Sequence, residues 1–143
     1  MREKNILFVC IHNSARSQIA EALCNQMCAG RFHAISAGLT PGKLNPLAVE
    51  VLKEEGIDIS NKATRDVFDI VKSAQMFAFV VTVCDETSAE RCPIFAGLTT
   101  RLHWSFSDPS QFEGNWEEKL EKTRAVREEI RAKLKEFCAE QCA

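Results

Sequence analysis

The chain has 143 residues, of which 45% are hydrophobic and 27% are charged, and its formal net charge is −2. This length and composition suit one globular domain, residues 1–143, and exclude a disordered or fibrous protein. The small net charge argues against a nucleic-acid partner, and the N-terminal apolar run is too short for a signal peptide or membrane span, so we expect a cytoplasmic protein without membrane contact.

Apolar runs and helical periodicities alternate along the chain. They predict a strand over residues 5–10, a helix from Ser17 to a stop at Gly30, and a strand over 32–37. Further along, they predict a helix from Pro46 that ends by Gly56, a short helix over 67–72, strands over 76–84 and 100–104, and a helix over 117–137. This alternation predicts an α/β fold: a single three-layer domain with a four-stranded parallel sheet and helices on both faces.

Three residues with useful chemistry lie at or after predicted strand ends: Cys10 and Cys84 end their strands, and Asp108 lies in the loop after another. Ligands of open parallel sheets bind beyond the carboxyl ends of the strands. We therefore expect these three residues to share one site.

The seven cysteines do not suggest a closed disulfide framework, because their number is odd and a reducing compartment removes structural bridges. Cys24 and Cys28, like Cys138 and Cys142, are spaced by one helical turn, which is the spacing of half a metal site. No matching histidine pair accompanies them. We therefore expect these cysteines to pack as small apolar side chains.

The segment after the first strand predicts an anion-binding loop that leads into a helix. Backbone N–H groups in such a turn point into one concavity, and the helix dipole attracts an anion there. An arginine adds a charged fork for two oxygens of a tetrahedral anion, and the same field stabilises a thiolate. The nucleophile is Cys10, and the predicted oxyanion-binding residues are Ile11, His12, Asn13, Ser14, Ala15, Arg16 and Ser17.

Two loop residues have narrower predicted roles. The Ser17 hydroxyl is placed to donate to the Cys10 sulfur, and Asn13 to brace the loop backbone. The bare C-x5-R spacing is a loose pattern, whereas the following serine and the strand-to-helix context make it specific. The alternative is a buried strand-end cysteine beside a surface arginine.

The segment "SFSDPS" supplies a candidate acid. Pro109 favours an extended backbone at Asp108, which fixes the direction of the carboxyl group. A carboxyl group that faces an oxyanion can donate a proton to a leaving oxygen. The alternative is a simple turn, the usual role of an Asp-Pro pair.

Several segments together resemble a known family: "VCIHNSARSQIAEA", "SAG" at 36–38, "LNPLAVEVLKEEGIDIS", "VVTVCDETSAERCP" and "HWSFSDP". They are similar to the arsenate reductases that are built on the low-molecular-weight tyrosine phosphatase fold and recharged by thioredoxin. The resemblance extends over nearly the whole chain. Its most specific part is the pair Cys84 and Cys92 followed by Pro93, because the plain phosphatases lack this pair.

The resemblance implies a mechanism. Cys10 would attack arsenate held by the loop and Arg16, with phosphate or sulfate as competing oxyanions, and Asp108 would protonate the departing oxygen. Cys84 would attack Cys10 and release arsenite, and Cys92 would take over the disulfide, which thioredoxin reduces. It implies no tightly bound cofactor, and we expect a monomer.

The geometry of strands and helices limits which of these sulfurs can be joined. Neighbouring strands lie about 4.8 Å apart, which allows a disulfide across the ends at Cys10 and Cys84 if these strands are neighbours. The segment "DETSAER" is compatible with a helix, and a helical step from Cys84 to Cys92 spans ~12 Å, whereas bridged Cα atoms lie within about 7 Å. We therefore predict that oxidation remodels residues 85–92.

The chain also departs from the family pattern. His12 stands where we expect glycine, so that its imidazole either contacts the oxyanion or points to solvent. Some relatives bind potassium near the loop. Asn13, Glu21 and Ser36 match such a site, and its remaining carboxylate is either Asp66 or absent.

Two other functions remain open at this point. One is a low-molecular-weight protein tyrosine phosphatase that uses Cys10, Arg16 and Asp108 through a thiol-phosphate intermediate. The other is a non-catalytic oxyanion sensor in which the cysteines only signal. Cys84 and Cys92 favour the reductase over the phosphatase, and arsenate turnover would exclude the sensor.

Overall fold

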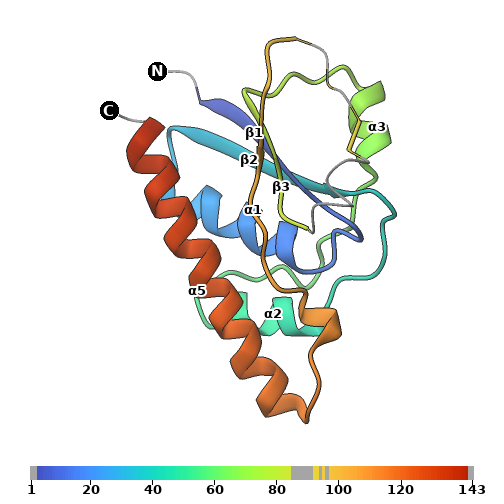
Figure 1. The fold of residues 1–143 in the computed structure, drawn as a ribbon, viewed down its shortest axis with the longest axis vertical. Coiled ribbons are helices and arrows are strands. Elements are labelled where there is room, and N and C mark those ends of the chain that lie inside the picture. Colours follow the sequence, from blue (N-terminus) through green and yellow to red (C-terminus); the bar gives the residue numbers. More distant parts are fainter. Residues whose placement is uncertain (1–2, 85–91, 94, 96, 142–143) are drawn as a thin grey trace.

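The computed structural model describes residues 3–84, 92, 93, 95 and 97–141 (Figure 1). Its helices and strands follow the predicted alternation along the chain. They are β1 Lys4–Cys10, α1 Arg16–Met27, β2 Phe32–Gly38, α2 Pro46–Lys53, α3 Val67–Lys72, β3 Phe79–Thr82, β4 Thr100–His103, the short 3₁₀ helix η1 Pro109–Gln111 and α5 Trp116–Gln141.

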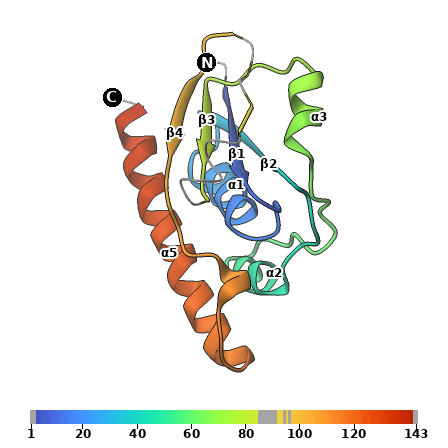
Figure 2. The same ribbon diagram turned by 45° about the vertical axis from the view of Figure 1, so that its right-hand side comes forward.

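The four strands form one parallel sheet in the order β2-β1-β3-β4, as Figure 2 shows. This confirms the predicted four-stranded parallel sheet. β1 is a central strand, and its last residue, Cys10, is in register with Gly38 at the end of β2. On its other side Val9 is in register with Thr82 of β3. The chain segments that follow β1, β2 and β3 therefore emerge at the same edge of the sheet.

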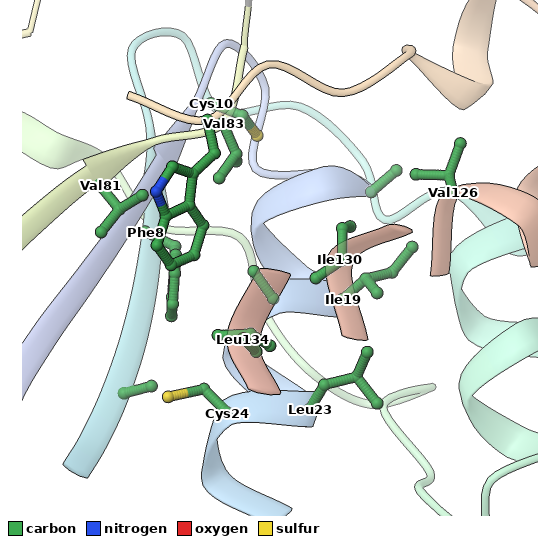
Figure 3. Packing of buried hydrophobic residues seen from close by; sticks show 14 of the residues in the cluster. Phe8, Cys10, Ile19, Leu23, Cys24, Val81, Val83, Val126, Ile130 and Leu134 are labelled. Atoms are coloured by element: carbon green, nitrogen blue, oxygen red, sulfur yellow. The ribbon is translucent and has the colours of Figure 1, made fainter. Parts of the chain in front are cut away.

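Both faces of the sheet are covered, which explains why β1 is apolar throughout. Ile6 and Phe8 face a large cluster that includes buried residues of α1, α2 and α5 (Figure 3). Leu7 and Val9 face a smaller cluster that includes residues of α3. Side chains alternate between the faces of a strand, so a strand buried on both sides carries no polar alternation. The predicted three layers are confirmed.

Some element bounds differ from the prediction. The strand predicted over 76–84 is shorter, because Met76 lies before the ladder with 61% of its surface exposed and Cys84 lies beyond it. The last helix is longer and begins at Trp116, where the Asn115 side chain accepts a hydrogen bond from the Glu118 N–H at 2.9 Å. Among the described residues, no helix is long and apolar enough to cross a membrane.

The expectation that Cys28 and Cys138 pack as thiols is wrong, because the structure joins them in a disulfide with Cα atoms 6.3 Å apart. The two residues are separated by 110 positions and meet because α1 and α5 pack on the same face of the sheet. Cys24 is fully buried as a small apolar residue, as predicted. Cys142 lies outside the described residues, and the described part of the chain contains no cluster of three metal-ligating side chains.

Candidate active site

The loop between β1 and α1 is fixed from outside by the segment that follows β2. The carbonyl oxygens of Cys10, Ile11, His12 and Ser14 accept hydrogen bonds from the N–H groups of residues 39, 40, 42 and 45, at 2.8 to 3.1 Å. With these carbonyls turned toward that segment, the N–H groups of the loop are left to face its interior. Such an array of amides at a helix N-terminus binds anions.

This close approach depends on Gly38. A Cβ atom on Gly38 would lie 2.8 Å from the Asn13 nitrogen and 2.8 Å from the Ile11 oxygen, which is closer than real Cβ atoms come to backbone. Asn13 itself has a φ of 56°, in the left-handed region that asparagine tolerates better than most residues. A glycine at the end of β2 and an asparagine in the loop therefore let the two segments pack together.

The sulfur of Cys10 lies inside this loop and is contacted by two groups. The Asn13 N–H donates to Cys10 Sγ at 3.2 Å, and Ser17 Oγ lies 2.9 Å from the same sulfur. Ser17 Oγ accepts from Asn13 Nδ2 at 2.7 Å, so that its own hydrogen is left to donate to the sulfur. The Ser17 contact agrees with its predicted orientation. The Asn13 side chain, predicted to brace the loop backbone, instead bonds to other side chains and to the Arg65 N–H.

Asn13 is the centre of a buried network that sequence reasoning foresaw only in part. Its Nδ2 also donates to Ser36 Oγ at 2.9 Å, and its Oδ1 accepts from Gln18 Nε2 at 3.1 Å and from the Arg65 N–H at 2.9 Å. Gln18 Nε2 also donates to the Asn13 carbonyl at 3.0 Å. No sequence pattern marked Gln18 or Arg65, because they reach Asn13 only through the fold.

Arg16 and Asp108 meet beside the loop although 92 positions of sequence separate them. Arg16 Nη2 lies 3.4 Å from Asp108 Oδ2, and its Nη1 donates to the Phe106 carbonyl at 3.4 Å. The Asp108 carboxyl also accepts from the Ser110 N–H at 2.9 Å, which fixes its direction at the start of η1. Asp108 is thus within reach of an oxyanion that occupies the loop and contacts Arg16.

His12 points away from the loop interior. Its Nδ1 lies 2.9 Å from the Thr40 carbonyl oxygen, to which it donates, and the ring packs beside Gly42. The imidazole therefore belongs to the contacts that fasten the loop to the segment after β2. Of the two orientations considered from the sequence, the one directed at an oxyanion is not adopted.

The predicted redox cysteines lie in two different places. Cys10 and Cys84 belong to the same buried cluster, and Cys84 follows β3, the neighbour of β1. Cys92 is buried in the cluster on the opposite face of the sheet, where its carbonyl accepts from Arg101 Nη2 at 3.4 Å. Burial raises the pKa of the Cys92 thiol. Residues 85–91, in the segment predicted to remodel, lie outside the described residues.

The residues predicted for potassium are close together, but two basic side chains join them. Ser36 Oγ donates to Glu21 Oε1 at 3.0 Å and accepts from Asn13. The Lys62 ammonium forms an ion pair with Glu21 Oε2, and Arg65 Nη1 lies 3.8 Å from Oε1. The Asp66 carboxyl caps α3, where its Oδ1 accepts from the Phe68 N–H at 2.8 Å.

A cavity of about 440 Å³ adjoins the loop on the side of η1. Ser14 of the loop and Pro109 line it, together with Phe112 and Trp116. Lys119 of α5 gives this wall a positive charge. The cavity is large enough for an organic group attached to an oxyanion in the loop.

A sulfur that accepts a hydrogen bond inside such a loop, beside an arginine and an aspartate, is the arrangement expected in enzymes that attack tetrahedral oxyanions through sulfur. Comparison with known proteins gives the same class. Residues 5–142 match the low molecular weight phosphotyrosine protein phosphatase family, and the chain belongs to this family. The predicted family and fold are thereby confirmed.

Within the family, the chain is similar to arsenate reductases. It is 42% identical over 139 residues to the arsenate reductase of Bacillus subtilis (strain 168), a match that covers 96% of each chain. The structure of an arsenate reductase from Archaeoglobus fulgidus is 30% identical, with a TM-score of 0.74 over 94% of this chain and 98% of that one. The thioredoxin-dependent arsenate reductase of Corynebacterium glutamicum is 25% identical, with a TM-score of 0.71 over 98% of this chain and 62% of that longer one.

Proposed function

We propose that the chain reduces arsenate to arsenite with Cys10 as the nucleophile. The Cys10 thiolate attacks arsenic in an arsenate ion held by the loop amides and Arg16. A sulfur–arsenic bond forms, and one arsenate oxygen leaves as water. The contacts of the Cys10 sulfur carry this proposal, because the Asn13 N–H and the Ser17 hydroxyl hold the sulfur inside the loop where the oxyanion would bind.

Asp108 supplies the proton for the departing oxygen. Without a bound anion its carboxyl group is paired with Arg16 at 3.4 Å. An oxyanion that binds the Arg16 guanidinium competes with the Asp108 carboxyl group for it. The oxygens of the bound oxyanion then lie beside Asp108. A positioned carboxyl group at this distance is suited to general acid catalysis.

Cys84 completes the reduction. Its thiolate attacks Cys10 Sγ, the sulfur–arsenic bond breaks with its electron pair on arsenic, and arsenite leaves while a Cys10–Cys84 disulfide forms. The position of Cys84 after β3, beside β1 and in the same buried cluster as Cys10, supports this step. The thiolate of Cys92 then attacks Cys84, which regenerates Cys10.

The exchange between Cys84 and Cys92 requires movement of the chain. Cys92 is buried on the other face of the sheet, and burial raises the pKa of its thiol, which disfavours the attacking thiolate. We propose that formation of the first disulfide rearranges residues 85–92 and exposes Cys92. Equal hydrogen exchange in this segment in both redox states would contradict this step.

The reductant proposed for the Cys84–Cys92 disulfide is thioredoxin. The similarity to a thioredoxin-dependent arsenate reductase supports this choice. A thioredoxin dithiol reduces the disulfide by exchange and becomes a disulfide itself, so that electrons balance over the cycle.

The decisive experiment measures arsenite production with thioredoxin as the only electron source. The wild type is expected to turn over repeatedly, Cys84→Ser to release no arsenite, and Cys92→Ser to stop after about one arsenite per chain. Repeated turnover by both variants at the wild-type rate would overturn the cysteine cascade. The Cys24→Ser variant is the matched control, since Cys24 is buried away from the loop.

The cavity beside the loop supports phosphomonoester hydrolysis as a second candidate function. An aryl phosphate can place its phosphoryl group in the loop and its ring against Phe112 and Trp116. This reaction needs Cys10, Arg16 and Asp108 but no second sulfur. It predicts that Cys92→Ser hydrolyses an aryl phosphate at the wild-type rate and that Cys10→Ser does not. Absence of hydrolysis by the wild type would exclude it.

A further inference from the structure

Glu21 is an acidic side chain of α1 that the reaction proposed above does not use. It is 7% exposed, and both of its carboxylate oxygens are engaged. Ser36 Oγ donates to Oε1 at 3.0 Å, the Lys62 ammonium pairs with Oε2, and Arg65 Nη1 lies 3.8 Å from Oε1. A buried carboxylate requires such partners, because an uncompensated charge there is costly.

A chain of hydrogen bonds runs from this carboxylate to the nucleophile. Ser36 Oγ, which donates to Glu21, accepts from Asn13 Nδ2 at 2.9 Å. The same nitrogen donates to Ser17 Oγ at 2.7 Å, and Ser17 Oγ lies 2.9 Å from Cys10 Sγ. Each group in this chain fixes the orientation of the next, so the charge state of Glu21 bears on the placement of Asn13 and Ser17.

The same residues do not fit a bound potassium ion. A potassium ion needs several oxygen lone pairs in place of its hydration shell. Here Lys62 and Arg65 form ion pairs with the Glu21 carboxylate. Asn13 Oδ1 accepts hydrogen bonds from Gln18 and from the Arg65 N–H. One buried side-chain oxygen in the described residues, Gln18 Oε1, lacks a partner, and a single amide oxygen is no substitute for a hydration shell.

We propose that the Lys62 ammonium is a built-in cation that positions the nucleophile loop, so that the reaction needs no dissociable monovalent cation. Lys62 is suited to this role because its side chain is only 20% exposed and its ammonium contacts Glu21 directly. Arg65 contributes less, since it is 45% exposed and more distant, and water screens its charge. Lys62 touches neither substrate nor Cys10 and is therefore a positioning residue. The inference rests on the proposed function only for its choice of substrate.

An ion pair with a purely structural role would give a different result from a positioning one. Removing Lys62 leaves a buried carboxylate without its main counter-ion, which destabilises the chain in either case. Only the positioning role predicts that the KM and Kd of the variant respond to potassium, because an ion in the space that the Lys62 ammonium leaves beside Glu21 would then restore the loop. It also predicts a change in oxyanion binding, since Asn13 and Ser17 belong to the loop.

The test compares wild type, Lys62→Gln and Lys72→Gln, in which the exposed Lys72 of α3 is the matched control. The KM and kcat for arsenate, the Kd for phosphate and the Tm are measured in potassium and in choline salts of equal ionic strength. Wild type and Lys72→Gln are expected to behave alike in both salts. In choline, Lys62→Gln is expected to raise KM and Kd by about tenfold, the lower range for loss of a group that orients ligating side chains. Potassium is expected to restore most of this loss and to raise the Tm of this variant alone.

Two results would overturn the proposal: stimulation of the wild type by potassium, or unchanged KM and Kd in Lys62→Gln without potassium. If Lys62→Gln does not fold, Lys62→Arg is used instead, because arginine keeps the positive charge. This variant is expected to have the wild-type KM for arsenate without potassium, and a raised KM would also contradict the proposal. The phosphate Kd separates this inference from the proposed function. A chain that binds phosphate as expected but reduces no arsenate would refute only the reductase.

Discussion

Sulfur atoms gather at two opposite ends of the sheet, and the two groups have different surroundings. At the carboxyl end, Cys10 lies in a polar loop, with an N–H and a hydroxyl on its sulfur. At the amino end, Cys28 and Cys138 form a disulfide, and Cys24 lies nearby among apolar side chains (Figure 3). Burial raises the pKa of the Cys24 thiol to about 12.

The difference shows that two cysteines can be equally buried and still have different partners. Cys10 and Cys24 are almost equally inaccessible, at 2% and 0% exposure. An N–H and a hydroxyl contact the sulfur at one end, whereas apolar neighbours surround the sulfur at the other. We therefore expect substitutions at the carboxyl end to affect turnover and substitutions at the amino end to affect stability.

The largest expected effect is that of Arg16→Lys. Lysine keeps the positive charge but lacks the planar fork that contacts two oxygens and Asp108. We expect kcat/KM for arsenate to fall about 10³-fold, the upper range for removal of one oxyanion donor. The Tm should stay close to that of the wild type, which is checked by calorimetry. A loss of kcat/KM smaller than about tenfold would mean that Arg16 does not contact the reacting oxyanion.

At the amino end, the largest expected effect comes from Cys28→Ser. The disulfide closes a segment of 110 residues and ties α1 to α5. Its loss is expected to lower the free energy of unfolding by about 2–5 kcal/mol, measured by urea denaturation. At temperatures well below the Tm, kcat for arsenate should be unchanged. Cys138→Ser should behave identically. A fall in kcat without a fall in stability would contradict the expectation that substitutions at the amino end affect only stability.

The sequence was sufficient for those features whose causes are local. The apolar run of β1, the start of α2 at Pro46 and the loop from Cys10 to Ser17 are contiguous patterns, and each was predicted. Asp108 was found because a proline follows it.

Features that arise from tertiary contacts were missed. The Cys28–Cys138 disulfide depends on the packing of α1 and α5, and the position of Lys62 beside Glu21 depends on the path of the chain between α2 and α3. Sequence spacing directed attention to the pair Cys24 and Cys28 instead. No local pattern carries the information that a residue 110 positions away will be the partner.

Gly38→Ala is expected to have an intermediate effect on both turnover and stability. The new Cβ would collide with backbone atoms of Asn13 and Ile11 at 2.8 Å, so the loop must shift away from the end of β2. We expect a loss of about 1–3 kcal/mol in stability, as for other overpacked sites, together with a raised KM for arsenate. Gly30→Ala is the control: its Cβ meets nothing within 4 Å, although its φ of +85° is strained for alanine. Gly30→Ala should therefore lose stability without a change in KM, and a raised KM in that variant would contradict this explanation.

The smallest expected effect concerns the pH dependence of stability at the amino end. The Cys24 thiol keeps its proton in the folded chain up to a pKa of about 12, compared with the ordinary value of 9.0. Between these values the folded state binds more protons than the unfolded state, so this group makes stability fall as pH rises above about 9. The slope from one such group is about 1.4 kcal/mol per pH unit at most. Urea denaturation between pH 8 and pH 10 should show a shallower loss of stability in Cys24→Ala than in the wild type, and parallel curves would mean that Cys24 ionises as easily in the folded chain as in the unfolded one.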